Sequence, residues 1–412
     1  MFQLRLKEKN NLAGAELAFA QLDTAPVSFW IDSSGGPEEH CKNSFCGINP
    51  KYYFYGSLNE VNLYEYDSGA TTFVNGNCFN FIEEKINEEK ANKDGIFVGY
   101  FSYDLFQGNK GASHPDFFFA YFEKIIPLHS LPLTPSPHLL FPPFSLLKIS
   151  SNMTDAEYLK KVKQIKEEIK AGNVYQVNLT REYSLEIKNV DELDIYLRLR
   201  SASPNPYGCY FKTPFISILS SSPEEFLFIE PRYHERYVRT RPIKGTLPKN
   251  IFEIDPKNQA ENIMIVDLER NDLGRICEYG SIHAEKLLDI ESYEHLNHVV
   301  STVRGKLRPD IKLKEIFKAL FPGGSITGAP KIAAMKIIDK TEPTKRGAYT
   351  GSFGYIKTDG TMNFNILIRT IFVQKNKITF NIGGGIVADS EPESELEEIE
   401  LKAKGIMAAL GL

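Results

Sequence analysis

The stretch TDAEYLKKVKQIKEEIKAGNVYQVNLTREYSLEI, residues 154–187, joins one clear helix to one clear strand, and the fold class follows from how the chain continues around it. Thr154 and Glu157 form a capping box, which marks a helix start. Gly172 is a stop signal. The apolar residues between these signals recur at helical spacing, at Leu159, Val162, Ile165 and Ile169.

The second half of this stretch alternates as a half-buried strand does. The side chains of one face are Tyr175, Val177 and Leu179, and those of the opposite face are Gln176, Asn178 and Thr180. A polar face on such a strand suits a binding site.

The elements after residue 187 predict an α+β fold. Strands and helices come in runs rather than in single alternation, which argues against a parallel doubly wound sheet. We expect strands at FISILSS, FLFIE, GSFGYIK, NFNILIRTIFV and KITFNIGGG, and helices over residues 256–273, 330–338 and 392–410.

The sequence before residue 149 divides into two parts. Residues 1–127 contain short aromatic and β-branched runs that favour strands, with one helix near residues 78–92. The proline-rich stretch that follows is unsuited to a helix or a central strand. We therefore predict a strand-rich N-terminal region (1–127) packed against the core, a connector (128–148) and a main region (149–412).

Composition excludes several classes of function. The 412 residues are 42% hydrophobic and 25% charged, as in ordinary globular proteins, and the formal net charge is −5. A net negative charge argues against nucleic acid or an acidic membrane as the general partner. The N-terminus lacks an apolar signal core, and no apolar run is long enough to span a bilayer. We expect a cytoplasmic protein.

The cysteines predict neither disulfides nor a zinc site. They are odd in number and scattered, and they lack C-x-x-C spacing and suitably spaced histidines. We expect reduced, structural thiols at Cys41, Cys46, Cys78, Cys209 and Cys277.

The helix over residues 392–410 places acidic residues beside an apolar stripe. Glu395, Glu398 and Lys402 share one side of this helix. One interpretation is a solvated flank with a weak glutamate–lysine pair. The other is a Mg²⁺ site, because this hard cation prefers carboxylate oxygens and keeps water and ligand oxygens as well.

The segment DPKNQAENIMIVDLERNDLG predicts a second helix that we expect to be buried on most sides, with Asp255 as its cap. Asp267 and Arg270 are spaced for an ion pair. Glu261 lies in the first buried turn, where a carboxylate needs a cation, so it is a candidate metal ligand opposite Glu398.

Two glycine-rich stretches predict close approach of backbone to a ligand. FPGGSITGAPK precedes a helix with Thr327 as a plausible cap and Pro330 at its first position, and free N–H groups there suit a carboxylate. It is a poor P-loop, so a nucleotide is disfavoured. In GGGIVADS, Gly383, Gly384 and Gly385 end a strand and carry no side chains, so a ligand can approach the backbone closely. A sharp turn explains these three glycines equally well.

Taken together, these motifs resemble the chorismate-utilising enzymes in order and spacing. The resemblance rests on SPEEFLF, RPIKGT, ENIMIVDLERNDLGR, HVVSTVRG, FPGGSITGAPK, GSFGY, ILIRT and GGGIVADSEPESELEEIELKAK, and it runs from about Gly95 to the C-terminus. It implies an α+β fold like that of anthranilate synthase, a two-sheet β sandwich flanked by helices, with residues 149–412 as the chorismate-binding catalytic region.

The resemblance also implies roles for individual residues. Glu261 and Glu398 would coordinate Mg²⁺, with Glu395 close by, and the metal would hold the ring carboxylate of chorismate. The residues implied to bind substrate are Ser325, Thr327, Tyr355, Arg369, Gly383, Gly384, Gly385 and Lys402, with Arg369 and Tyr355 meeting the enolpyruvyl carboxylate.

Three further positions match catalytic residues of the family. Glu224 corresponds to the acid that protonates the departing C4 hydroxyl, which requires a carboxyl with a raised pKa. His298 corresponds to a histidine beside the substrate ring, although without the resemblance it would be taken for a core histidine. Gln176 stands where the members that add water carry a lysine, which disfavours hydration.

Lys244 in RPIKGT resembles the subfamily of aminodeoxychorismate synthases, whereas anthranilate synthases normally have alanine there. Amination at C4 needs a group that first occupies C2 and later leaves. A neutral lysine can attack C2 as the C4 hydroxyl departs, and ammonia can then add at C4. Pro242 and Gly245 predict a rigid turn that orients this lysine.

The implied product is 4-amino-4-deoxychorismate, a precursor of p-aminobenzoate and folate, formed by an enzyme that convention places among the transferases. Because the chain shows no glutaminase motif, we expect a separate glutamine amidotransferase subunit to supply ammonia. The alternatives are anthranilate synthase component I and a non-catalytic anion-binding homologue. The carboxyl groups of Glu224, Glu261 and Glu398 argue against the latter, since an anion binder gains nothing from buried negative charge.

Overall fold

The computed structural model describes residues 22, 24–37, 44–108, 113–128, 149–187, 190–294 and 296–412. The predicted connector, apart from Leu128, lies outside the described residues, as do residues 1–21 and Cys41. Cys46, Cys78, Cys209 and Cys277 are free and buried, as predicted.

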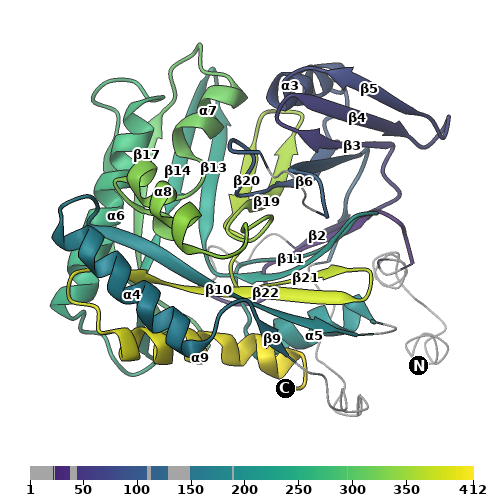
Figure 1. Ribbon diagram of the computed structural model, residues 1–412. Helices are drawn as coiled ribbons and strands as arrows, with labels where there is room; N and C mark the ends of the chain where they lie inside the picture. The colour runs from purple at the N-terminus through teal and green to yellow at the C-terminus, as the bar shows by residue number, and fades with distance from the viewer. Residues whose placement is uncertain are drawn as a thin grey trace.

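The strands of the described residues form two sheets with antiparallel neighbours (Figure 1). The ten-stranded sheet has the spatial order β18 (Gly328–Ala329), β10 (Gln176–Glu186), β22 (Lys377–Ile386), β21 (Thr370–Gln374), β12 (Ser217–Ser222), β11 (Tyr207–Lys212), β1 (Ser28–Asp32), β2 (Phe45–Ile48) and β8 (Ile126–Pro127), with β9 (Ser150–Ser151) beside β10.

The twelve-stranded sheet contains most of the predicted N-terminal region. Its order is β15 (Ile243–Pro248), β17 (Leu296–Lys306), β14 (Glu235–Arg241), β13 (Glu225–Arg232), β20 (Met362–Asn365), β19 (Ser352–Lys357), β6 (Ile96–Phe101), β7 (Phe117–Phe122), β3 (Tyr52–Ser57), β4 (Glu60–Glu65) and β5 (Thr71–Asn75), with β16 (His283–Ser292) beside β17.

The helices lie on the outer faces of the two sheets. They are α3 (Cys78–Glu88), α4 (Asp155–Lys170), α5 (Glu192–Ala202), α6 (Pro256–Gly274), α7 (Leu313–Leu320), α8 (Lys331–Thr341) and α9 (Pro392–Ala409), with a 3₁₀ turn η1 at Gly324–Ile326. In Figure 1, α4 and α9 run below the ten-stranded sheet, and α6 and α7 lie beside the other sheet.

Three apolar clusters hold these layers together. One lies between the sheets and includes Phe29, Phe118 and Phe211. Another joins α4, α5 and α9 to the ten-stranded sheet, and the third joins α3, α6 and α7 to the twelve-stranded sheet. The predicted two-sheet sandwich flanked by helices is therefore confirmed.

Two of the connections that take the chain from one sheet to the other lie next to each other. After β12 the chain passes through Glu224 into β13, and after β20 it passes through Arg369 into β21. The two crossings are joined because the Ser222 hydroxyl donates to the Ile366 carbonyl at 2.6 Å and the Ile366 N–H donates to the Glu224 carbonyl at 3.1 Å. NFNILIRTIFV is therefore two strands in different sheets, not one strand as expected.

Several local predictions hold. The capping box of Thr154 and Glu157 is present, and Asp255 caps α6. On α9 the stripe Ile399, Ala403 and Ile406 is buried, as expected.

Other local predictions are wrong because tertiary packing decides them. Helix α6 is not buried on most sides, since Ile263 is 44% exposed and Asp267 and Arg270 form their ion pair in solvent. Tyr175 lies outside β10 and is 68% exposed. Both faces of β10 are covered, so Gln176 and Asn178 are buried although they are polar.

Candidate active site

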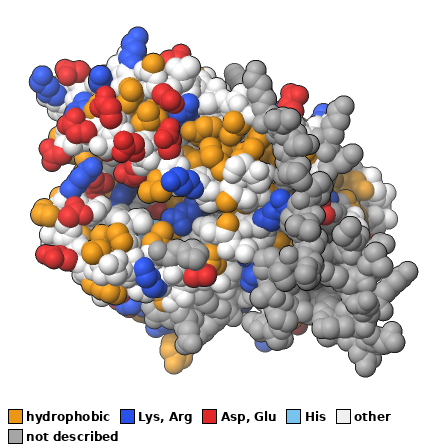
Figure 2. All heavy atoms as spheres, turned by 90° about the horizontal axis from the view of Figure 1, so that it is seen from below, with side chains coloured by type: hydrophobic (Ala, Val, Ile, Leu, Met, Phe, Trp, Pro, Cys, Tyr) orange, Lys and Arg blue, Asp and Glu red, His pale blue; other side chains and the backbone are white. Residues whose placement is uncertain are grey.

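A cavity of about 730 Å³ opens where the two sheet crossings meet α9 and α6. Its lining includes Glu224 and Arg369 from the crossings, Lys244 from β15, and glycines from β22. Figure 2 shows the face below α9, where a hollow has both basic and acidic side chains on its walls. The cavity therefore offers charges of both signs to a small polar ligand.

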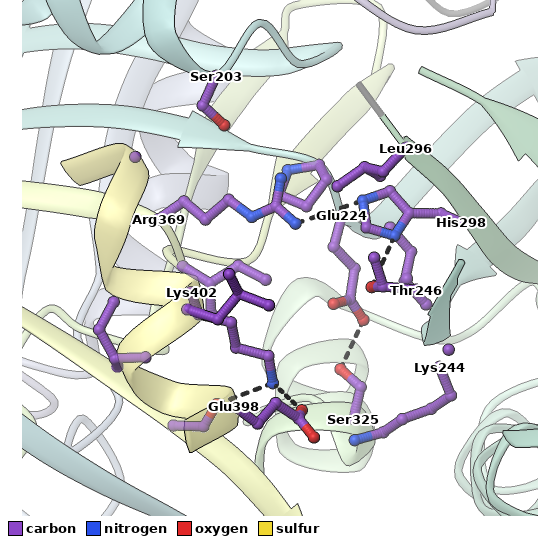
Figure 3. A pocket seen from close by; sticks show the side chains of 18 of the residues that line it. Ser203, Glu224, Lys244, Thr246, Leu296, His298, Ser325, Arg369, Glu398 and Lys402 are labelled. Carbon is purple, nitrogen blue, oxygen red and sulfur yellow. Dashed lines mark hydrogen bonds and ion pairs between the residues drawn. The ribbon is translucent and has the colours of Figure 1, made fainter. Parts of the chain in front are cut away.

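Glu224 is a buried carboxyl at the first crossing. It is 3% exposed, and its Oε1 accepts a hydrogen bond from the Ser325 hydroxyl at 2.5 Å (Figure 3). Burial raises its pKa to about 7, against the opposing effects of Ser325, Lys244 and Arg369. A carboxyl with such a pKa can donate a proton near neutral pH.

Lys244 reaches the cavity from a β-bulge in β15. The register against β17 shifts between Ile243 and Thr246, and Gly245 has a φ of +103°. The expected rigid turn is therefore a strand with a bulge, which re-aims a side chain in a comparable way. Burial lowers the pKa of Lys244, while Glu261 and Glu224 oppose this effect, so its amine loses a proton more readily than a solvated lysine.

Gly385 lines the cavity beside this lysine, and Gln176 lies next to Gly385 but is not itself in the cavity lining. A Cβ on Gly385 would lie 2.5 Å from the Gln176 Nε2 and 3.4 Å from the Lys244 Nζ. Gln176 is fully buried, and both polar atoms of its amide are without a hydrogen-bond partner. Such a group is costly to bury, and its nearest charged neighbour across Gly385 is the lysine amine.

Arg369 and His298 interact at the second crossing. The Arg369 guanidinium lies 3.4 Å from His298 Nε2, and His298 Nδ1 lies 3.2 Å from the Thr246 hydroxyl. Burial lowers the pKa of His298 to about 3, and the Arg369 charge lowers it further, so the ring is neutral. A neutral ring accepts from Arg369 at Nε2, and its proton then lies on Nδ1.

Three glutamates face the cavity from α6 and α9. Glu261 belongs to α6, and Glu395 and Glu398 belong to α9. Lys257 approaches Glu395 at 3.6 Å, and Lys402 pairs with Glu398 at 2.6 Å. Burial raises the pKa of Glu261, and the two glutamates of α9 raise it further.

This donor set fits a hard cation held by few protein ligands. Within the described ranges, no three Asp, Glu, His or Cys side chains lie close enough to form a metal cluster. Mg²⁺ commonly binds through one or two carboxylates together with waters and oxygens of the substrate. The mutual repulsion at Glu261 is what such a cation would relieve.

The structure brings most predicted site residues together. The cavity is lined by Glu224, Lys244, Glu261, His298, Ser325, Arg369, Gly383, Gly385, Glu395, Glu398 and Lys402. Lys402 also donates to the Gly383 carbonyl at 3.2 Å, which ties α9 to β22.

Three predicted binding residues lie elsewhere. Tyr355 packs edge-to-face on Phe45 between the sheets, because its position in β19 directs it away from the cavity. The Thr327 hydroxyl donates to the Gly323 carbonyl at 2.8 Å and is not in the cavity wall. Gly384 faces α9, since alternate residues of a strand point to opposite sides.

The expected start of α8 is wrong, and the anion site predicted there lies outside the cavity lining. Pro330 is the cap of α8 rather than its first residue, and Thr327 makes no capping bond. The cavity lining includes Ser325 and Ile326 but no residue of α8.

Sequence reasoning missed two residues that shape the cavity. Tyr349 lines it and is buried, and it stands six residues before the tyrosine that was expected to do so. The Asn262 amide donates to the Lys244 carbonyl at 3.3 Å and to the Val299 carbonyl at 3.2 Å, which holds the bulge. A polar residue directly after Glu261 on a helix was the only signal for this role.

Comparison with known proteins agrees with this geometry. A family model described as chorismate binding enzyme matches residues 44–408. The chain is 42% identical over 261 residues to the chloroplastic aminodeoxychorismate synthase of Arabidopsis thaliana, which covers 60% of this chain and 28% of that protein. It is 40% identical over 270 residues to aminodeoxychorismate synthase component 1 of Bacillus subtilis, covering 63% and 56%.

An anthranilate synthase is similar to nearly the same degree. Anthranilate synthase component 1 of Synechocystis is 39% identical over 281 residues, covering 64% of this chain and 55% of that protein. The chain thus spans from 28% to 56% of the length of these three relatives. Among solved structures, anthranilate synthase component I of Streptococcus pneumoniae has a TM-score of 0.70 at 23% identity, covering 98% and 96% of the two chains, which shows a shared fold.

Proposed function

The chain belongs to the chorismate binding enzyme family, and we propose that it is the component of an aminodeoxychorismate synthase that converts chorismate and ammonia to 4-amino-4-deoxychorismate. The observation that supports this choice is Lys244, whose amine reaches the cavity beside Gln176 and interacts with the charges of Glu224 and Glu261. Arg369 and Lys402 supply positive charge for a dianionic substrate.

The proposed reaction has two allylic substitutions. The neutral Lys244 amine forms a bond to C2 of the ring while the double bonds shift and the C4 hydroxyl leaves as water with the Glu224 proton. Ammonia then forms a bond to C4, the double bonds shift back, and the C2–nitrogen bond breaks to restore the neutral lysine amine. The new ammonium group at C4 gives up one proton, which restores the protonated Glu224. Held in the bulge, the lysine starts each cycle in place, which lowers the entropic cost of attack.

We also propose that Glu261 and Glu398 hold Mg²⁺, with Glu395 close by. When bound, the cation supplies positive charge that holds the ring carboxylate of chorismate. Glu261→Gln should weaken Mg²⁺ binding to the resting protein about tenfold or more, measured by calorimetry without substrate. Asp267→Asn, an exposed change on the same helix, is the matched control. Equal affinity in the Glu261 variant and the control would contradict this assignment.

The ammonia source and the location are proposals too. The name of the Bacillus subtilis relative, component 1, is that of one part of a larger enzyme. We propose a glutamine amidotransferase subunit as the partner of this chain, in p-aminobenzoate and folate synthesis. None of the described helices is long and apolar enough to cross a bilayer, and a cytoplasmic location stays a prediction.

The test is product analysis with chorismate, Mg²⁺ and ammonium. We expect a product with the mass of 4-amino-4-deoxychorismate that an aminodeoxychorismate lyase converts to p-aminobenzoate. Lys244→Ala should abolish formation of this product, and a melting curve like that of the wild type would show that the variant is folded. Anthranilate as the product would favour the alternative, anthranilate synthase component I. Chorismate binding without turnover would favour the non-catalytic homologue.

A further inference from the structure

Glu269 lies directly behind the turn that holds Ser325. It belongs to α6, is 5% exposed and is not part of the cavity wall. Its Oε1 accepts the Gly324 N–H at 3.2 Å. A Cβ on Gly324 would lie 2.9 Å from this oxygen and 2.7 Å from Leu268, so the helix packs on the bare backbone.

The turn is held by a carboxyl group on each side. Glu269 binds the backbone N–H of Gly324, and the next residue, Ser325, donates its hydroxyl to Glu224 at 2.5 Å. The two carboxyls are thus linked through two consecutive residues of η1. Moving the turn away from Glu269 would move the Ser325 hydroxyl away from Glu224.

Both carboxyls have cations beside them, and Lys244 and Arg369 favour a charged Glu224. Burial raises the pKa of each to about 7, and the Glu224 charge raises that of Glu269 further. On α8, Lys331 favours a charged Glu269, although Asp272 opposes it and pairs with Lys331 at 2.5 Å. Two coupled acids of this kind hold about one proton between them near neutral pH.

Resting on the function proposed above, we propose that Glu269 is a positioning residue for the proton donor: its carboxylate accepts the Gly324 N–H and so fixes the Gly324–Ser325 turn against Glu224, and a negative charge on Glu269 disfavours a second negative charge on Glu224. The Gly324 N–H stabilises the charge on Glu269. The Ser325 hydroxyl donates to Oε1 of Glu224, so the position of this turn sets the position of the proton donor.

Two variants separate the charge from the hydrogen bond. In Glu269→Gln the amide oxygen still accepts from Gly324, but the charge is gone, so the pKa of Glu224 falls. Because Glu224 must be protonated to act, the loss of kcat at high pH should begin about one pH unit lower than in the wild type. Glu269→Leu removes both interactions and should in addition lower kcat about tenfold at every pH, with KM nearly unchanged.

Two controls separate the effect of Glu269 from other changes. Asp267→Asn on the exposed side of α6 should leave the profile as in the wild type, and free ammonia is held constant across pH. Infrared spectroscopy measures the same proton without turnover. The band of a protonated carboxyl that is present in the wild type and absent in Glu224→Gln belongs to Glu224. This band should be weaker at pH 7 in Glu269→Gln than in the wild type.

Superimposable pH profiles and equal infrared bands in the wild type and Glu269→Gln would overturn the inference. Its failure is distinct from failure of the proposed function. If the wild type makes anthranilate, the function is wrong, yet the pH profile of that product and the infrared band still test Glu269. If the wild type makes the C4 amine and the profiles coincide, only the inference fails.

Discussion

Glu224 and Lys244 have opposite shifts in pKa although burial acts on both. Burial disfavours charge, so it raises the pKa of the carboxyl to about 7 and lowers that of the amine. The result is an acid that keeps its proton and a base that can lose one, side by side in a single cavity. This pairing suits a reaction in which an amine attacks while a hydroxyl leaves.

His298 gives a prediction about stability at acid pH. Its folded pKa is about 3, against 6.5 for an ordinary histidine. Below pH 6.5 the unfolded chain binds a proton at this histidine that the folded protein does not bind. The free energy of unfolding therefore falls as the pH falls toward 3, and this residue does not affect it above pH 6.5. From pH 7.5 to pH 5 this residue should account for about 2 kcal/mol of the loss.

Chemical denaturation of the wild type and His298→Gln at these two pH values measures this contribution. The variant should lose less of its unfolding free energy than the wild type between pH 7.5 and pH 5. Equal losses would show that His298 is protonated in the folded protein.

At the residue scale, the sequence predicted which residue types form the site better than it predicted where each side chain points. Lys244 and the glutamates line one cavity as predicted, because charged groups in apolar segments need a shared polar site. Tyr355 and Tyr349 lie in the same short segment, and only the position of the strand decides which of them reaches the cavity. The sequence did not predict a role for Glu269, because the partner of its carboxylate is a backbone N–H in a turn far along the chain.

At the scale of elements, β22 presents two adjacent glycines to different surroundings. Gly385→Ala should abolish most activity, because its Cβ would lie 2.5 Å from the Gln176 Nε2 and displace the amide beside Lys244. In Gly384→Ala the nearest atom, the Glu395 Oε2, lies at 3.4 Å, an ordinary contact. This variant should keep most of the wild-type kcat.

Steady-state kinetics and melting curves of the two variants test this contrast. We expect a loss of kcat of about a hundredfold or more for Gly385→Ala alone. Equal kcat values in the two variants would show that the position of the Gln176 amide does not matter for turnover.

Element boundaries were predictable where local chemistry sets them. The capping box at Thr154 and the cap at Asp255 act within one turn of helix, so the sequence contains them in full. The break between β20 and β21 was not predictable, because the apolar pattern continues through it while the chain changes sheets. The bulge at Gly245 likewise depends on β17, a strand about fifty residues later.

At the scale of the whole molecule, the sandwich places the crossings at Glu224 and Arg369 and the helices α6 and α9 around one cavity. The fold class followed from the resemblance and the order of elements. The strand order did not, because β10 and β22 lie side by side although about two hundred residues separate them. Only the closed sandwich brings Glu261 of α6 and Glu398 of α9 to the lining of one cavity.

The need for a partner subunit is a prediction at this scale. The isolated chain should aminate chorismate with ammonium but not with glutamine, because we assign no glutamine-hydrolysing group to it. Adding a purified glutamine amidotransferase of the matching kind should restore the use of glutamine. Efficient use of glutamine by the isolated chain would contradict the proposed partner.

The central claim is a covalent bond between Lys244 and the substrate ring, and peptide mapping after rapid acid quench tests it most directly. The protein is mixed with chorismate and Mg²⁺ without ammonium, digested and analysed by mass spectrometry. We predict that the Lys244 peptide gains the mass of chorismate less one water, and that ammonium removes this adduct as the C4 amine forms. Formation of the C4 amine at the wild-type rate by Lys244→Ala, with no adduct on the wild-type peptide at any time, would contradict the account.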